Sequence, residues 1–502
     1  MKDHWIKGKR LHRPFILVSV MLAMFLSAIE ATIVATAMPT IVADLGGFSL
    51  YSWVFSIYLL TSAATILIFG KLADIYGRKP IFVSGILLFL LGSTLSGFSI
   101  TMYQLIGSRF IQGIGAGALM PMATTIVGDI YNKQERAKIQ GYLSAVWGIS
   151  AVSGPLLGGL FVDLLDWRYV FWMNIPLGLL AMLGIIIFLR EDMIKKPQTI
   201  DYKGSILLIV MISLLVFILV EGGVSIAWDS IHMIILLSIT AIACGLFYLQ
   251  QKSVADPMMP FEIWRHEVIR IANITSLLTG MILIGVSSYL PAFVQGVMGK
   301  SAMVAGFTLT TMSIGWPIAS VVAGRLLLVK GYRITSLFGG FSLVIGSLIF
   351  FMLSPERGPI WAGTGSFFIG IGMGMTSTAF IVAIQSSTPW DIRGIATAAN
   401  MFMRSLGSVL GVALFGGLLN SEINKYIGTA GLDGQINVDS TDKLLAGEQS
   451  ATLSGQEKVV LEEGLTSGLH HIYVVLALLA IMSLILIYFM PRDHNKGSVR
   501  EE

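Results

Sequence analysis

The most constraining feature of the sequence is a series of fourteen long apolar runs. A helix that crosses a bilayer needs about 20 mostly apolar residues, whereas a transmembrane β-strand alternates polar and apolar residues over about ten. These runs are continuous and of helical length, so they predict an all-α polytopic membrane protein with fourteen transmembrane helices. They lie at about 15–37, 51–69, 81–98, 102–128, 139–162, 170–189, 204–220, 231–249, 271–294, 303–323, 334–353, 360–384, 395–419 and 472–490.

The composition agrees with a membrane protein. Of the 502 residues, 55% are hydrophobic and 12% are charged, about half of the charged share of a soluble domain, which is ~25%. This excludes a soluble enzyme, a nucleic-acid-binding protein and a disordered scaffold. The net charge of +4 is too small to indicate a polyanionic partner. Cys244 is the single cysteine, which excludes a disulfide framework and a thiolate cluster, and we expect neither a metal nor a cofactor.

Lysine and arginine are distributed unevenly between the two sides of the predicted spans. With the N-terminus inside, the inner side carries 25 of the 33 positive residues and the outer side carries six, while Arg109 and Arg404 lie within spans. Because cytoplasmic loops carry an excess of Lys and Arg, we expect both termini to be cytoplasmic. The expected location is the plasma or inner cell membrane, crossed an even number of times.

The sequence contains an internal repeat. Segment 70–79 shares with segment 324–333, which lies 254 residues later, a Gly-basic-Leu opening, a second glycine and a further basic residue. The three alternate glycines of 113–117 recur at 370–374, at an offset of 257. Membrane transporters are often built from such duplicated halves, which enclose one central site and rock around it.

The repeat divides the chain into three parts. We predict an N-terminal six-helix bundle at 1–190, linkers and an inserted helix pair at 191–265, and a C-terminal six-helix bundle at 266–502. The second bundle includes an outer loop at 421–466, which has eight acidic residues and three lysines. Such a composition is typical of a solvated segment, and the loop has no counterpart in the first half, so we expect it to be dispensable for folding.

Short motifs occur in order along the predicted spans. G-K-L-A-D-I-Y-G-R-K fills 70–79, R-F-I-Q-G-I-G fills 109–115, and G-P-L-L-G-G fills 154–159. W-R-Y-V-F-W-M-N-I-P follows at 167–176, and a Glu-initiated stretch precedes them at 30–39. Over nearly its whole length, the chain resembles the fourteen-helix drug:proton antiporter branch of the major facilitator superfamily. The resemblance implies the major facilitator fold, with two six-helix bundles and an inserted pair, and proton-driven efflux of amphipathic, often cationic drugs.

The resemblance also implies two groups of functional residues. A cytoplasmic gate would close the inner side, although the same charges could be ordinary positive-inside residues. In the second half Leu328 replaces the gate carboxylate, so the gate would be asymmetric. An antiporter motif would bend and pack a moving helix, because proline removes a ladder hydrogen bond; a tolerated membrane kink is the alternative. The gate residues are Gly70, Asp74, Gly77, Arg78 and Arg136, and the antiporter-motif residues are Gly154, Pro155, Gly158 and Gly159.

Glu30 is the one carboxylate deep within a predicted span. Charged residues inside membranes cost several kcal/mol and commonly mark transport pathways. Glu30 lies in the outer third of its span, and Arg109 lies roughly 10 Å below the outer surface, counting ~1.5 Å per residue. The two charges therefore share a depth, and we expect Glu30 to alternate between a proton and a cationic drug beside Arg109. The resembling family has Asp in place of Glu30, and the alternative is a structural ion pair.

Arg404 lies about ten residues into the thirteenth span, and Asn400 precedes it by one turn. The resembling branch has a similar N-x-x-x-R pattern here, which assigns both residues to coupling. The Arg404 cation could bind an anionic substrate group or a network of backbone carbonyls. A purely structural arginine that packs between helices is the alternative.

We expect a transporter, not an enzyme, with small amphipathic or cationic substrates, protons and the lipid bilayer as its partners. It should bind no nucleic acid and should function as a monomer, driven by the proton gradient. A dedicated exporter of one antibiotic, metabolite or lipid is the nearest alternative. A membrane receptor or channel is a further alternative, which the duplicated 70–79 motif and Pro155 disfavour.

Overall fold

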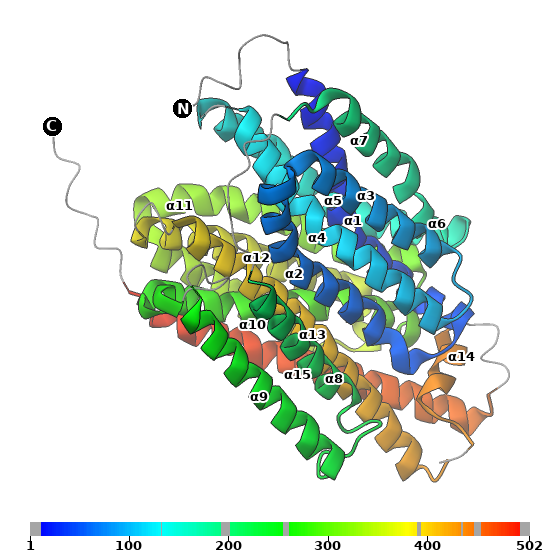
Figure 1. The fold of residues 1–502 in the computed structure, drawn as a ribbon. Coiled ribbons are helices and arrows are strands. Elements are labelled where there is room, and N and C mark those ends of the chain that lie inside the picture. The colour runs from blue at the N-terminus through cyan, green and yellow to red at the C-terminus, as the bar shows by residue number, and fades with distance from the viewer. Residues whose placement is uncertain are drawn as a thin grey trace.

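The computed structural model describes residues 12–131, 133–191, 201–254, 261–388, 393–432, 435–445 and 453–491. Across these ranges the long regular elements are helices, and an isolated β-bridge joins Gly222 to Ile226. The long helices lie side by side (Figure 1). They are α1 (Arg13–Leu45), α2 (Tyr51–Tyr76), α3 (Arg78–Gly97), α4 (Met102–Ile130), α5 (Lys133–Leu164), α7 (Asn174–Phe188), α8 (Tyr202–Glu221), α9 (Ile231–Ser253), α10 (Glu267–Ala292), α11 (Ala302–Phe351), α12 (Gly358–Ser387), α13 (Arg393–Thr429) and α15 (Gly455–Tyr488).

Shorter helices connect the long ones. η2 precedes α2, α6 precedes α7, and η3 and η4 flank α10. Further on, η5 precedes α12, and η6 and α14 lie between α13 and α15. Their bounds are η2 (Phe48–Leu50), α6 (Tyr169–Trp172), η3 (Phe261–Arg265), η4 (Phe293–Val297), η5 (Pro355–Arg357), η6 (Val438–Ser440) and α14 (Thr441–Leu445).

Thirteen helical segments of the described chain are long and apolar enough to cross a membrane. One of them, α11, has 50 residues and is interrupted at Gly331, where φ is 77° and ψ is 175°. Glycine adopts this positive φ without the steric penalty of a Cβ atom. Each part of α11 is long enough for one crossing, so the thirteen segments provide the fourteen predicted spans.

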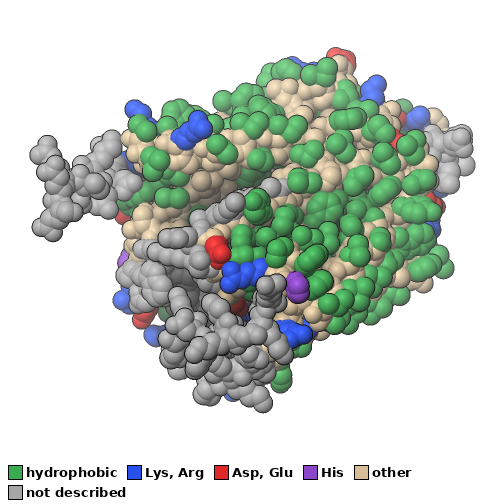
Figure 2. Space-filling view, turned by 90° about the horizontal axis from the view of Figure 1, so that it is seen from above, with side chains coloured by type: hydrophobic (Ala, Val, Ile, Leu, Met, Phe, Trp, Pro, Cys, Tyr) green, Lys and Arg blue, Asp and Glu red, His purple; other side chains and the backbone are tan. Residues whose placement is uncertain are grey.

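Large apolar side chains cover the outside of the molecule. On α9, Ile235, Ile242 and Leu249 are 49%, 62% and 61% exposed, and α3 presents a similar row. In Figure 2 hydrophobic side chains spread over much of the face shown, and charged side chains are few. An apolar area of this extent on the surface is typical of contact with lipid.

The helices form two bundles with a helix pair on one flank. Helices α1 to α5 and α7 pack with one another, and so do α10 to α13 and α15. Helix α8 packs against both α2 and α13, and α9 covers α8 (Figure 1). The contact between the pair and the bundles is apolar, with Leu60 of α2, Ile212 of α8 and Val409 of α13 in one buried cluster.

The two bundles share a core at one end only. We call the end where α1 begins and α15 ends the terminal end, and the opposite end the α14 end (Figure 1). Toward the α14 end, a single apolar cluster joins Ile33 of the first bundle to Tyr289 and Tyr473 of the second. At the terminal end each bundle has its own core. The bundles are therefore joined at the α14 end and separate at the terminal end.

Hydrogen bonds reinforce this contact between the bundles at the α14 end, which we call the joint. The Tyr51 hydroxyl donates to the Ser288 carbonyl at 2.6 Å, and Gln295 Nε2 donates to the Thr36 carbonyl at 3.0 Å. Each bond connects one bundle to the other within the shared core, where a lost partner would leave a buried polar group unsatisfied. The joint is thus both apolar and specifically bonded.

The segment 435–445, which we call the cap segment, lies across the α14 end. Its Val438 and Leu444 are buried in the shared core, and Asp439 Oδ1 accepts a hydrogen bond from the Ser49 amide at 2.9 Å. The structure differs here from the predicted outer loop at 421–466, because α13 continues to Thr429 and α15 already begins at Gly455. Helices can extend beyond the apolar part of a span, which hydropathy alone does not reveal.

Candidate functional site

Glu30 and Arg109 form an ion pair inside the first bundle. Glu30 is on α1 and Arg109 is on α4, and each residue is only 1% exposed. Arg109 Nη1 contacts Glu30 Oε1 directly. The sequence placed these two charges at one depth, and the structure brings them together.

Two amides complete this cluster. Asn174, the first residue of α7, donates from Nδ2 to Glu30 Oε2 at 2.9 Å and to Ser93 Oγ at 2.9 Å. Arg109 Nη1 also donates to Gln112 Oε1 at 2.8 Å. Buried charges are tolerated where such partners satisfy them. The carboxylate is thus held by three helices of the first bundle, α1, α4 and α7.

Aromatic rings enclose the Arg109 guanidinium. Its central carbon lies 4.1 Å from the centroid of the Tyr58 ring and 6.0 Å from that of Phe171. A cation over an aromatic face is attracted by the negative centre of the ring. Tyr58 and Asn174 were not among the predicted site residues, although the N-I-P end of the 167–176 motif offered a signal for Asn174.

The antiporter motif lies where α5 contacts α1 of its own bundle and α11 of the second bundle. A side chain at Gly154 or Gly158 would collide with α1, whereas one at Gly159 would meet the α11 backbone. The Pro155 carbonyl lies against Gly306 of α11, where a Cβ atom would also clash. Small residues allow helix backbones to approach closely in membranes. Pro155 and Gly159 therefore form part of the contact between the bundles, whereas Gly154 and Gly158 pack α5 against α1 within the first bundle.

The predicted gate residues are at the terminal end. Gly77 has a φ of 96° and forms the turn between α2 and α3, and Gly70 has no neighbour within 4 Å of an added Cβ. Arg78 forms an ion pair with Asp129 of α4, within the first bundle. The side chains of Asp74 and Arg136 lie outside the described residues, so their predicted role in the gate stays a prediction.

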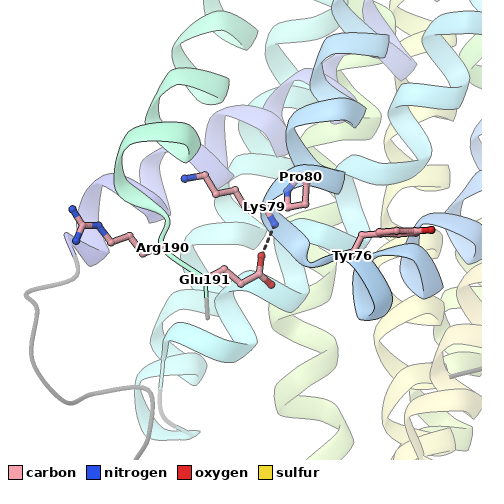
Figure 3. A pocket seen from close by; sticks show the side chains of 5 residues that line it. All are labelled: Tyr76, Lys79, Pro80, Arg190 and Glu191. Carbon is pink, nitrogen blue, oxygen red and sulfur yellow. Dashed lines mark hydrogen bonds between the residues drawn. The ribbon is translucent and has the colours of Figure 1, made fainter. Parts of the chain in front are cut away.

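Glu191 caps the start of α3. Its two carboxylate oxygens accept from the Arg78 and Lys79 amides at 2.8 and 2.9 Å, where unpaired amides favour a negative charge. Glu191 and Lys79 also line a surface pocket, together with Tyr76, Pro80 and Arg190. Figure 3 shows Glu191 directed toward Lys79, with Arg190 pointing away. Glu191 was not among the predicted site residues, although an acid directly after a span offered a signal for it.

Arg404 and Asn400 lie in the second bundle and are not part of the Glu30 cluster. Asn400 Nδ2 donates to Asn273 Oδ1 at 3.1 Å and to Ser276 Oγ at 2.8 Å, both on α10. Arg404 is partly buried, and its side chain has no hydrogen bond or ion pair within the described part of the chain. The charges of the Glu30 cluster are thus paired, whereas Arg404, in the other bundle, has no partner in the described chain.

A titratable group also lies on the cap segment, outside the spans. The Asp442 carboxylate lies against the end of α1, where its Oδ2 would be 3.3 Å from a Cβ added at Gly46. Burial, with a smaller contribution from the nearby Asp439, raises the pKa of Asp442 above its ordinary value of 3.8. Docking of the cap segment therefore favours the protonated form of this carboxyl.

A comparison with protein families decides which fold these features represent. Residues 20–412 match the model of the Major Facilitator Superfamily. The chain belongs to this superfamily. The match covers most of both bundles and the inserted pair, and it confirms the predicted fold class, an all-α major facilitator fold with fourteen spans.

Relatives of this superfamily member span nearly its whole length. It is 34% identical over 500 residues to Multidrug resistance protein 3 of Bacillus subtilis, covering 97% of each chain. It is also 34% identical over 415 residues to the multidrug transporter protein MdtP of Bacillus subtilis, covering 83% of this chain and 77% of that one. The resemblance that the motifs indicated is confirmed.

A solved structure shows the same major facilitator fold. A bacterial homolog of the human lysosomal transporter Spinster, in an inward-facing and unoccupied conformation, matches with a TM-score of 0.69. The alignment covers 96% of this chain and 98% of that one at 15% sequence identity. The comparison supports the fold and is independent of the sequence motifs.

Proposed function

We propose that this protein is a proton-coupled exporter of amphipathic compounds, cationic ones among them, in the cell membrane. Superfamily membership and the similarity to multidrug transporters support this function. The observation that carries it is the buried Glu30 cluster, which lies beside the joint of two bundles that separate at their other end. We further propose that it acts as a monomer and without a cofactor.

Alternating access supplies the transport step. The excess of Lys and Arg supports a cytoplasmic location for the terminal end. The described conformation would then be open to the cytoplasm and closed at the α14 end. Rocking of the two bundles would break the joint and open the opposite side, as in other transporters with duplicated halves. Packing of Gly159 and Pro155 against α11 holds the closed side in this conformation.

Glu30 would carry the proton. In the described conformation its carboxylate is occupied by Arg109 and Asn174, so a cationic drug could reach it only after Arg109 moves away. Protonation neutralises the carboxylate and weakens its attraction for Arg109, which loosens contacts among α1, α4 and α7. One charge that crosses 100 mV is worth ~2.3 kcal/mol, a driving force for extrusion of weakly bound compounds.

The gate assignment depends on the same two states. Arg78, paired with Asp129 inside its own bundle, would exchange partners when the terminal end closes. Asp74 and Arg136 would take part in that closure. A change there should act on the equilibrium between the two states and on turnover, because these residues lie far from the Glu30 cluster.

The test is transport by the reconstituted protein with a pH gradient as the sole driving force. Glu30→Gln should reduce uphill movement of a fluorescent lipophilic cation to background, because Gln keeps the shape but cannot bind a proton. Glu30→Asp should retain transport. Glu221→Gln is the matched control, because this carboxylate on α8 bonds only the Trp53 ring nitrogen among the hydrogen bonds described.

The possible outcomes separate the alternatives. Wild-type transport by Glu30→Gln would show that Glu30 forms a structural ion pair with Arg109. Downhill movement without any uphill movement in the wild type would indicate a channel. Transport of one compound from a broad panel would indicate a dedicated exporter.

A further inference from the structure

Two arginines lie within spans, and the structure treats them differently. Arg109 is neutralised by Glu30 and bonded to Gln112. Arg404 on α13 has no hydrogen bond or ion pair in the described part of the chain. Counted from Arg393, it lies about 16 Å along the helix at 1.5 Å per residue, far from either end. An unpaired arginine at such a depth is costly, so it requires an explanation.

Arg404 borders a side of α13 that becomes accessible toward the terminal end. Val412 is fully buried in the shared core at the joint. Three turns earlier Met401 lies on the same side of the helix, and it is 48% exposed. Arg404 is adjacent to Met401 at the i+3 position. The side of α13 that is buried at the joint is therefore accessible nearer the terminal end, beside Arg404.

Helix α10 shows the same change. It is mostly buried, and Asn273 and Thr275 are both 0% exposed, yet Ile274 between them is 37% exposed. Gly280 of α10 packs against the Arg404 carbonyl, which places these parts of α10 and α13 together. Arg404 is thus located where each of the two helices carries an accessible side chain, Met401 on α13 and Ile274 on α10.

The groups around Arg404 supply hydrogen-bond donors in excess. The Arg404 guanidinium has five N–H donors and no acceptor. One turn away, Asn400 donates both of its recorded bonds. Asn273 accepts one of these, and its own Nδ2 is buried without a partner in the structure. Arg404 and Asn273 Nδ2 therefore carry donors that no bond in the described chain satisfies, and the Glu30 carboxylate is not free for them because Arg109 and Asn174 occupy it.

We propose that Arg404 binds an anionic group, such as a carboxylate, of the transported amphiphile. The substrates favoured by this site would be zwitterionic or anionic, and lipophilic cations without an acceptor would bind more weakly. A carboxylate matches the planar guanidinium with two parallel hydrogen bonds. This inference rests on the proposed export function and specifies its substrate class.

The test uses two xanthene dyes that differ only in one group, a zwitterion with a free carboxylate and its cationic methyl ester. Binding of each dye to the purified full-length protein is measured by fluorescence anisotropy at neutral pH. The wild type should bind the carboxylate dye at least about tenfold more tightly, since a charged hydrogen bond is worth ~1.5–3 kcal/mol. Arg404→Met should abolish that preference and leave the affinity for the ester unchanged or increased.

Two further variants keep the test decisive. Arg404→Lys retains the charge without the planar fork and should keep part of the preference. Arg325→Met removes an exposed arginine of α11 and should leave the preference unchanged. Thermal unfolding identifies a misfolded Arg404→Met variant, in which case Arg404→Lys decides. A preference equal to the wild type in the folded variant would overturn the proposal.

Transport of the same dyes separates this inference from the proposed function. If the wild-type protein moves the ester uphill but neither binds nor moves the carboxylate dye, export stands and the anion site is wrong. If it moves neither dye under any gradient but binds the carboxylate dye through Arg404, the anion site stands and proton-driven export is wrong.

Discussion

The two halves of the repeat place charge in opposite ways. In the first bundle, Glu30 and Arg109 neutralise each other out of contact with solvent. At the repeat offset of 257, Ser366 stands where Arg109 would recur. Glu30 would recur at 284–287 for the two repeat offsets of 254 and 257, and no acid lies there. The second bundle instead carries Arg404 without a partner in the described chain. The two halves share the helices, their glycines and the basic residues of the 70–79 motif, while the charged residues within the spans differ.

This difference indicates a division of labour. A closed and neutral cluster suits a proton, which can reach it through small movements of the surrounding helices. An open cation beside accessible apolar side chains suits a larger amphiphile. Under the proposed function, the two sites communicate through the joint, because rocking of the bundles changes the surroundings of both.

The largest expected effect comes from removing one partner of the neutral cluster. Arg109→Met would leave Glu30 as an uncompensated buried carboxylate, and we expect the free energy of unfolding to fall by about 3–5 kcal/mol. Glu30→Gln in the same chain should restore most of this loss. Arg404→Met should not lower the free energy of unfolding and could raise it, because no described partner is lost and an unpaired arginine within a span is itself costly. Thermal unfolding in one detergent measures all three, and equal losses for Arg109→Met and Arg404→Met would remove the contrast between the bundles.

A moderate effect is expected at the joint. Gly159→Val places a side chain against the Met303 backbone, only 2.5 Å from an added Cβ, which destabilises the conformation closed at the α14 end. The population open at that end should rise about tenfold, for a change of ~1.4 kcal/mol. Spin-label distances across the joint, in a Cys244→Ser background, measure the shift. Gly245→Val is the control, because a Cβ there meets nothing within 4 Å.

The smallest effect is expected at the cap segment. Because burial raises the pKa of Asp442 when the segment is docked, protonation stabilises the docked form. Docking should be strongest at low pH and weaken as the pH rises through this raised pKa, above 3.8. Asp442→Asn should remove that pH dependence, measured by hydrogen exchange of the Ser49 amide. An unchanged pH profile in the variant would assign the effect to another group.

The sequence predicted the helical architecture because long apolar runs are local signals, whereas the orientation drawn from Lys and Arg stays a prediction. The pairing of Glu30 with Arg109 followed from counting depth along two helices. The roles of Asn174 and Glu191 were not predicted, because each acts on a residue more than 100 positions away. The isolation of Arg404 could not be predicted either, since the absence of a partner depends on how every neighbouring helix is rotated.

Hydropathy also did not predict the cap segment. Its apolar residues, Val438 and Leu444, are too few to form a recognisable run, yet both are buried in the shared core. Glu457 and Ser454 formed a readable capping box for the start of α15. Attention to such caps, in addition to apolar runs, would have shortened the predicted loop.

The inserted helix pair gives the molecule two unequal flanks. Helices α8 and α9 cover the seam between α2 and α13, with Ile212 and Val216 buried against both. The seam between α5 and α11 has no such cover among the described helices. Under the proposed function, a compound dissolved in the lipid would meet the helix pair on one flank and the uncovered α5–α11 seam on the other. A transporter of this construction would be asymmetric within the plane of the membrane, and its exchange with the surrounding leaflet would differ between the two flanks.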